Sequence, residues 1–112
     1  MTNSSKLKGD RAELEVQGIL RDLLGVPARR QLGAGRQDDI GDIDGVPDTV
    51  VAVRNRPSDM LRCFRELPVA AEAQRARAGV TFAVSFVRLR GGDYRVVLTP
   101  EQFAALWREA TA

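Results

Sequence analysis

One run of residues limits the possible folds of this chain more than any other. The segment DTVVAVRN, residues 48–55, is rich in β-branched side chains and lies between Pro47 and Pro57, so it predicts a short strand. A helical pattern follows to about Ala78, and the apolar residues 80–87 predict a second strand of buried type. We therefore expect a sheet with helices packed on it.

Further helical and strand-like segments precede this centre. Apolar residues recur at helical spacing over residues 9–24, and Gly25 should end that helix. Residues 28–32 predict a short strand. Ser58 is placed to cap the central helix, and Pro68 should kink that helix or divide it.

The C-terminal part predicts a hairpin and then a capped helix. Residues 91–93, Gly-Gly-Asp, form the turn between the strand over 80–87 and a return strand over 94–98. Thr99 is a natural N-cap, and Gln102 completes a capping box with it. Ordinary core packing is the main expectation for this helix, and an adaptor surface for a partner is the weaker one. Its apolar residues are Phe103, Leu106 and Trp107.

We expect the whole chain to form one α/β domain, with an element order of roughly αβββαββα. A length of 112 residues suits a single domain, which we place over residues 8–112 after a disordered segment, residues 1–7. The chain has no histidine, which excludes Ser-His triads, histidine acid–base catalysis and ordinary zinc sites. Any chemistry must therefore use carboxylates, Lys, Arg or a hard metal ion.

Charge and cysteine content leave the partner open but indicate the compartment. Cys63 is the single cysteine, so an internal disulfide is excluded. No secretory signal or membrane-length apolar run is present, and we expect a cytoplasmic protein of a bacterial or phage-infected cell. The net charge of +2 permits a nucleic-acid partner without requiring one. The excess of Arg over Lys fits either an anionic partner or a GC-rich genome.

Three short motifs occur in a suggestive order. They are KGDRAELEV at residues 8–16, which contains Glu13, GDIDG at residues 41–45, and VVAVRN at residues 50–55. This pattern resembles the small PD-(D/E)XK nucleases, in particular archaeal and phage Holliday-junction resolvases, and the later segments AEAQRARAG and TFAVSFVRLRGG resemble the phage branch. The resemblance implies a restriction-endonuclease-like mixed sheet flanked by helices.

The resemblance also implies a metal-dependent, structure-specific DNA endonuclease. Asp42 matches the metal-binding Asp, Glu13 matches the helix acid, and the Val53 carbonyl matches a main-chain metal ligand. Arg54 stands where the family has Lys. Such a site would use Mg²⁺ or Mn²⁺, because hard cations prefer carboxylate oxygens and activate water against a phosphodiester.

Ala52 departs from the pattern, because it stands where the family has a metal-binding Glu. Strand parity puts Val50, Ala52 and Arg54 on one face, so the methyl group replaces a carboxylate in the expected pocket. We expect the metal to be weakly bound or absent and the chain to be inactive as written. Either Ala52 is a deliberate replacement of Glu, or the chain is a natural pseudo-nuclease, unless another acid such as Asp44 or Asp39 completes the site.

Four arginines flank the proposed pocket in sequence and would form a basic rim for DNA phosphates. The partner would be branched or duplex DNA, met by a two-fold homodimer, with no membrane and no small-molecule cofactor involved. The alternative is a non-catalytic DNA- or protein-binding module on the same fold, such as a phage-encoded interaction protein or inhibitor. The arginines of the expected rim are Arg29, Arg30, Arg36 and Arg56.

Overall fold

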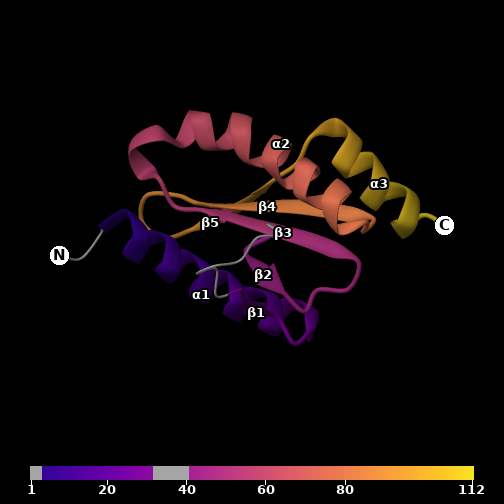
Figure 1. Ribbon diagram of the computed structural model, residues 1–112, viewed down its shortest axis with the longest axis horizontal. Coiled ribbons are helices and arrows are strands. Elements are labelled where there is room, and N and C mark those ends of the chain that lie inside the picture. Colours follow the sequence, from indigo (N-terminus) through magenta and orange to yellow (C-terminus); the bar gives the residue numbers. More distant parts are fainter. Residues whose placement is uncertain (1–3, 32–40) are drawn as a thin grey trace.

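The computed structural model describes residues 4–31 and 41–112 and shows a five-stranded mixed sheet between helices (Figure 1). This α/β architecture is consistent with a restriction-endonuclease-like fold, and the predicted element order is confirmed. The elements are α1 (Ser4–Leu24), β1 (Arg29–Arg30), β2 (Ile43–Asp44), β3 (Thr49–Arg54), the 3₁₀ turn η1 (Pro57–Asp59), α2 (Met60–Ala78), β4 (Phe82–Arg88), β5 (Tyr94–Val97) and α3 (Pro100–Ala110).

The strands follow one another across the sheet in chain order, β1-β2-β3-β4-β5. β3 and β4 are parallel, and the other neighbouring strands are antiparallel. Two adjacent parallel strands need a long crossover connection, which α2 supplies. α1 covers one face of the sheet and α2 the other, with α3 on the α2 side in Figure 1.

Each face of the sheet has its own core, and strand parity decides which β3 residue belongs to which. Val51 and Val53 pack toward α1, whereas Ala52 packs toward α2, as the alternation of the strand predicts. The α1-side core contains Ala12, Val16, Leu20, Ala28, Ile43, Val51, Val53 and Phe86. The α2-side core contains Ala52, Cys63, Leu67, Ala71, Ala83 and Val87.

Two helix starts differ from the sequence predictions, and Pro68 does not divide the central helix into two. α1 begins at Ser4, so residues 4–7 of the segment expected to be disordered are helical. Ser58 does not cap α2, because it lies within η1, and the N-cap is Asp59 without a side-chain hydrogen bond. α2 continues through Pro68 as a single helix.

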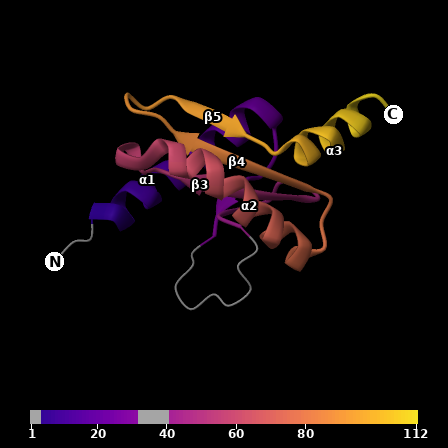
Figure 2. The same ribbon diagram turned by 90° about the horizontal axis from the view of Figure 1, so that it is seen from above.

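The start of α3 is as predicted, but its packing is not. Thr99 Oγ1 accepts a hydrogen bond from the Gln102 N–H at 3.1 Å, and Gln102 Oε1 accepts one from the Thr99 N–H at 3.0 Å, which completes the capping box. The buried residue of this helix is Gln102, while Phe103 is 56% and Trp107 59% exposed. The expectation of ordinary core packing for these aromatic residues is wrong, because α3 extends from one end of the molecule, as Figure 2 shows.

No helix within residues 4–31 and 41–112 is long and apolar enough to cross a membrane.

Candidate functional site

A hollow of about 210 Å³ opens where α1, the start of β2 and the end of β3 meet. It brings together Glu13, Asp42, Val53 and Arg54, which come from the three motifs that carried the sequence interpretation. We call it the acid hollow. Its full lining is Lys8, Gly9, Glu13, Asp42, Val53, Arg54, Asn55, Arg56, Pro57 and Ser58.

Backbone geometry holds Asp42 against β3. Gly41 has φ of 113°, and a Cβ there would lie 3.1 Å from the Val51 carbonyl oxygen, so glycine is required just before the acid. The Asp42 N–H donates to the Val51 carbonyl at 2.8 Å. Asp42 Oδ2 in turn accepts a hydrogen bond from the Val53 N–H at 2.8 Å. The carboxylate is therefore fixed over the end of β3, beside Arg54.

Glu13 reaches the acid hollow from the opposite side, on α1. Its side chain is 20% exposed, and burial raises the pKa of its carboxyl above the usual value. The negative charge of Asp42 raises this pKa further, whereas Arg30 opposes the shift. The two carboxylates thus interact through space, as two acids in one small site do.

Arg30 serves the acids and not the expected basic rim. Its Nη2 lies 2.6 Å from Asp10 Oδ1 and 3.2 Å from Glu13 Oε1, and its side chain is only 20% exposed. Its guanidinium therefore compensates carboxylates of α1 inside the fold. Sequence position could not show this, because the ion pairs form only when β1 packs against α1.

The other three arginines of the expected rim have different fates. Arg29 is exposed on β1 and does not line the acid hollow. Arg36 lies outside the described residues. Arg56 does line the hollow. The cations at this site are therefore Arg54, Arg56 and Lys8, of which only Lys8 was missed as a site residue.

Ala52 does not line the acid hollow. It is 1% exposed and packs toward α2 with Cys63 and Leu67. In the parallel register it lies directly beside Ser85 of β4, whose Oγ is buried and has no hydrogen-bond partner among the residues that the structure describes. A longer side chain at position 52 would therefore extend on the α2 side, next to an unpaired hydroxyl.

The described residues fit a strong Mg²⁺ site poorly. Within residues 4–31 and 41–112, no three His, Cys, Asp or Glu side chains are grouped so that they could hold a metal ion. The acid hollow offers Glu13 and Asp42, but the first is paired with Arg30 and the second accepts a backbone hydrogen bond. Asp44 is exposed on β2 and does not line the hollow, and Asp39 lies outside the described residues.

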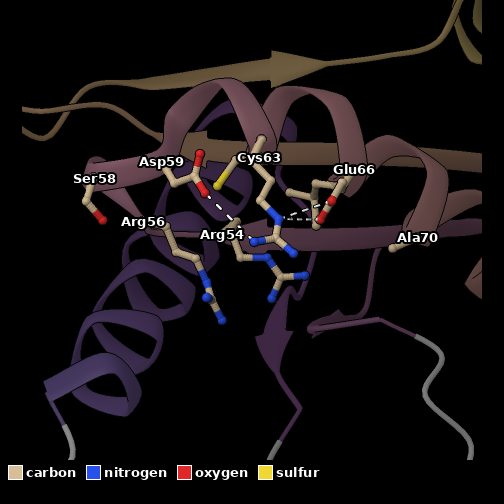
Figure 3. A pocket seen from close by; sticks show the side chains of 9 residues that line it. Arg54, Arg56, Ser58, Asp59, Cys63, Glu66 and Ala70 are labelled. Carbon is tan, nitrogen blue, oxygen red and sulfur yellow. Dashed lines mark hydrogen bonds and ion pairs between the residues drawn. The ribbon is translucent and has the colours of Figure 1, made fainter.

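A second and larger hollow, of about 400 Å³, lies on the α2 side of the same strand end (Figure 3). We call it the arginine hollow. It shares Arg54, Arg56 and Ser58 with the acid hollow. Its full lining is Arg54, Arg56, Ser58, Asp59, Arg62, Cys63, Glu66, Leu67 and Ala70.

Two of these arginines, Arg54 and Arg56, differ from Arg62 in their contacts. Within the described part of the chain, neither Arg54 nor Arg56 makes a side-chain hydrogen bond or ion pair, and Figure 3 shows both side chains without a contact to another residue drawn there. Arg62 is held by Glu66. Burial raises the pKa of the Cys63 thiol, so it is neutral near pH 7 and is not an activated nucleophile.

Arg62 was not among the site residues identified from the sequence, and its side chain is 67% exposed. The available signal was its spacing, because Arg62 and Glu66 lie one turn apart and flank the buried Cys63 and Leu67. That spacing puts them at the border of the buried helix face, where they line the hollow.

Comparisons with protein families, with curated proteins and with solved structures gave no match.

Proposed function

We propose that this chain binds the phosphodiester backbone of DNA at the end of β3, in the manner of a structure-specific endonuclease of the Holliday-junction resolvase type. The observation that carries the proposal is the convergence of Glu13, Asp42 and Arg54, from three separate segments, on one hollow. The resemblance of their motifs to the PD-(D/E)XK pattern supplies the reaction class. Branched DNA is the proposed substrate, and a two-fold dimer is the proposed binding form.

The cations of the strand end would hold the backbone. Among residues 4–31 and 41–112, no side chain pairs with the guanidinium groups of Arg54 and Arg56, and Arg is suited to paired hydrogen bonds with phosphate. Lys8 adds a third positive charge on the α1 side of the acid hollow. These groups neutralise phosphates and release counterions, which gives affinity without sequence preference.

Cleavage is expected to be absent from the chain as it stands. The two acids of the hollow are engaged within the protein, and position 52 carries a methyl group. The resemblance puts the missing carboxylate at position 52, whose side chain packs on the α2 side and not in the acid hollow.

A non-catalytic binding module is the second candidate. The observation in its favour is that Ala52 is 1% exposed and packed with Cys63 and Leu67, as a residue selected for packing would be. Binding without cleavage would then be the whole function of the site.

Gel-shift titrations of a four-way junction, a duplex and a single strand across a salt series test the binding. Arg54→Gln should weaken binding about tenfold or more and lower the slope of log affinity against log salt by about 1, because one phosphate contact is lost. The control Arg108→Gln removes the same charge from α3, at the opposite end of the molecule in Figure 1, and should change affinity little. Equal effects of the two changes, or no DNA binding at all, would remove the proposal.

Ala52→Glu separates the two candidates. An endonuclease ancestry predicts that this variant cuts four-way junctions in Mg²⁺ or Mn²⁺, while the unchanged chain and Ala52→Gln do not. Ala52→Gln matches the added volume without the charge, and circular dichroism checks that both variants fold. A folded Ala52→Glu variant that binds junctions and never cuts them would decide for the binding module.

A further inference from the structure

The arginine hollow is rich in arginine, as anion-binding sites are, and it contains neither of the acids Glu13 and Asp42 of the acid hollow. It carries Arg54, Arg56 and Arg62, together with the carboxylates of Asp59 and Glu66, around a floor that includes the buried Cys63 and Leu67. Its volume of about 400 Å³ is within the range of pockets that hold small ligands. A guanidinium rim over an apolar floor suits a phosphate attached to a less polar group, as in a nucleotide.

The two hollows are joined at the strand end. Arg54, Arg56 and Ser58 line both of them, so an extended phosphodiester chain that lies on one reaches the other past the same two guanidinium groups. The acid hollow has Glu13 and Asp42 on its far side, which repel a phosphate. The arginine hollow has a third arginine, Arg62, and two carboxylates of its own, Asp59 and Glu66. These two acids are 51% and 59% exposed, whereas Glu13 is 20% exposed, so solvent screens them more strongly.

The ion pairs of Arg62 are exposed enough for a phosphate to compete with them. Its Nε lies 3.1 Å from both Glu66 carboxylate oxygens, and its Nη1 lies 4.0 Å from Asp59 Oδ2. The side chains of Arg62 and Glu66 are 67% and 59% exposed. Ion pairs this exposed are weak and exchange readily, so a phosphate that enters the hollow can replace Glu66.

We propose that the arginine hollow is a second backbone subsite, which binds a neighbouring phosphate of the same nucleic-acid strand, and that Arg62 leaves Glu66 to bind it. The inference rests on the proposed function and extends it, since it assigns a direction to the strand, from the acid hollow across Arg54 toward α2. Glu66 then acts as a latch that lowers affinity by competing with the phosphate for Arg62.

Three variants of α2 with matched charge changes test the subsite in the junction gel-shift assay. Arg62→Gln should weaken binding about fivefold to tenfold and lower the salt slope by about 1. Arg65→Gln is the control, because Arg65 is exposed on the same helix but lines neither hollow, and it should leave the slope unchanged. Glu66→Gln should strengthen binding, because Arg62 is released.

The double variant Arg62→Gln/Glu66→Gln tests the latch itself. If Glu66 acts through Arg62, the gain from Glu66→Gln disappears when Arg62 is absent. Equal effects of Arg62→Gln and Arg65→Gln would overturn the second subsite, and a Glu66 gain that persists without Arg62 would overturn the latch. Arg54→Gln separates the test of DNA binding from the test of the second subsite. If Arg54→Gln still weakens binding, the proposed function stands even when the second subsite or the latch is overturned.

Discussion

The acid hollow and the arginine hollow lie on either side of one strand end, share three residues and still differ in chemistry. The acid hollow takes Lys8, Gly9 and Glu13 from α1, whereas the arginine hollow takes most of its lining from α2 and nothing from α1. The odd-numbered residues of β3 face α1 and the even-numbered ones face α2, so the strand presents different neighbours to each side. Each hollow has three cations and two carboxylates, but the acids of the arginine hollow, Asp59 and Glu66, are the more exposed. The comparison teaches that one short strand can give two adjacent sites of equal formal charge different solvent screening.

The largest expected effect on stability comes from removing a large side chain from the floor of the arginine hollow. Leu67 is 2% exposed in the α2-side core, and Leu67→Ala should lower the free energy of unfolding by about 2–5 kcal/mol, because burial is lost and a cavity is left. Val16→Ala in the α1-side core is the partner variant and should have a smaller effect, because it removes less volume. Urea unfolding followed by circular dichroism measures both.

The shape of those unfolding curves carries further information. β3 contributes to both cores, so each variant should unfold in one transition and the two faces should lose structure together. Two transitions in the Leu67→Ala variant would mean that the two sides are independent units, and the comparison would then describe two folding units and not one strand end.

An intermediate effect is expected at the contact that seats α1. Glu15 Oε1 accepts hydrogen bonds from the Tyr94 hydroxyl at 2.6 Å and from Arg88 Nε at 2.8 Å. Glu15→Gln should cost about 1 kcal/mol, since hydrogen bonds to a charged group are weakened at a partly exposed site. Hydrogen exchange should quicken in residues 8–13 and stay unchanged in residues 58–66. Faster exchange in both segments would show that α1 also supports the arginine hollow.

The pH dependence of that contact has a defined sign. The Tyr94 hydrogen bond holds the pKa of Glu15 below its usual value of 4.5, with Arg88 contributing in the same direction. A lowered pKa stabilises the fold above about pH 4.5, and this stability is lost as the pH falls through the lowered value. The gap in unfolding free energy between the unchanged chain and Glu15→Gln should therefore narrow in acid.

The smallest effect is expected at Glu13, and its sign is opposite. Burial, and then the charge of Asp42, raise the pKa of Glu13 above its usual value of 4.5. Its stabilising contribution is complete below that value and is lost as the pH rises through the raised pKa. The stability of Glu13→Gln relative to the unchanged chain should therefore increase as the pH rises above about 4.5. If the relative stability of Glu13→Gln instead followed the pH trend expected for Glu15→Gln, the charge of Arg30 would outweigh burial in setting the pKa of Glu13.

Much of the site was accessible from local patterns. The Gly-Asp-Ile turn, the helix acid and the strand cation were identified from short motifs, and Glu13, Asp42 and Arg54 do line one hollow. Their side chains depend on a turn that requires glycine at position 41 and on a strand of period two, both of which are local properties. Arg30 was wrongly placed in a basic rim, and Arg62 was not identified as a site residue, because what a charged side chain contacts depends on the segment that packs beside it.

The α3 helix shows the same limit at the level of the fold. Its capping box follows from four consecutive residues and was predicted correctly, since capping is satisfied within one turn. The exposure of Phe103 and Trp107 could not be predicted, because the pattern of an apolar helix face does not show whether another part of the chain packs against it.

The amino-acid sequence by itself determined the order of helices and strands, the parity of β3 and the glycine turn before Asp42, since backbone preferences and side-chain periodicity act over a few residues. Only the tertiary structure decided that Ala52 packs against α2 and that Arg30 forms an ion pair with Glu13. It also decided that Arg62 and Arg54 line the same second hollow. Burial and ion pairing join residues distant in the chain, so the packing of α1 and α2 against the sheet selects them.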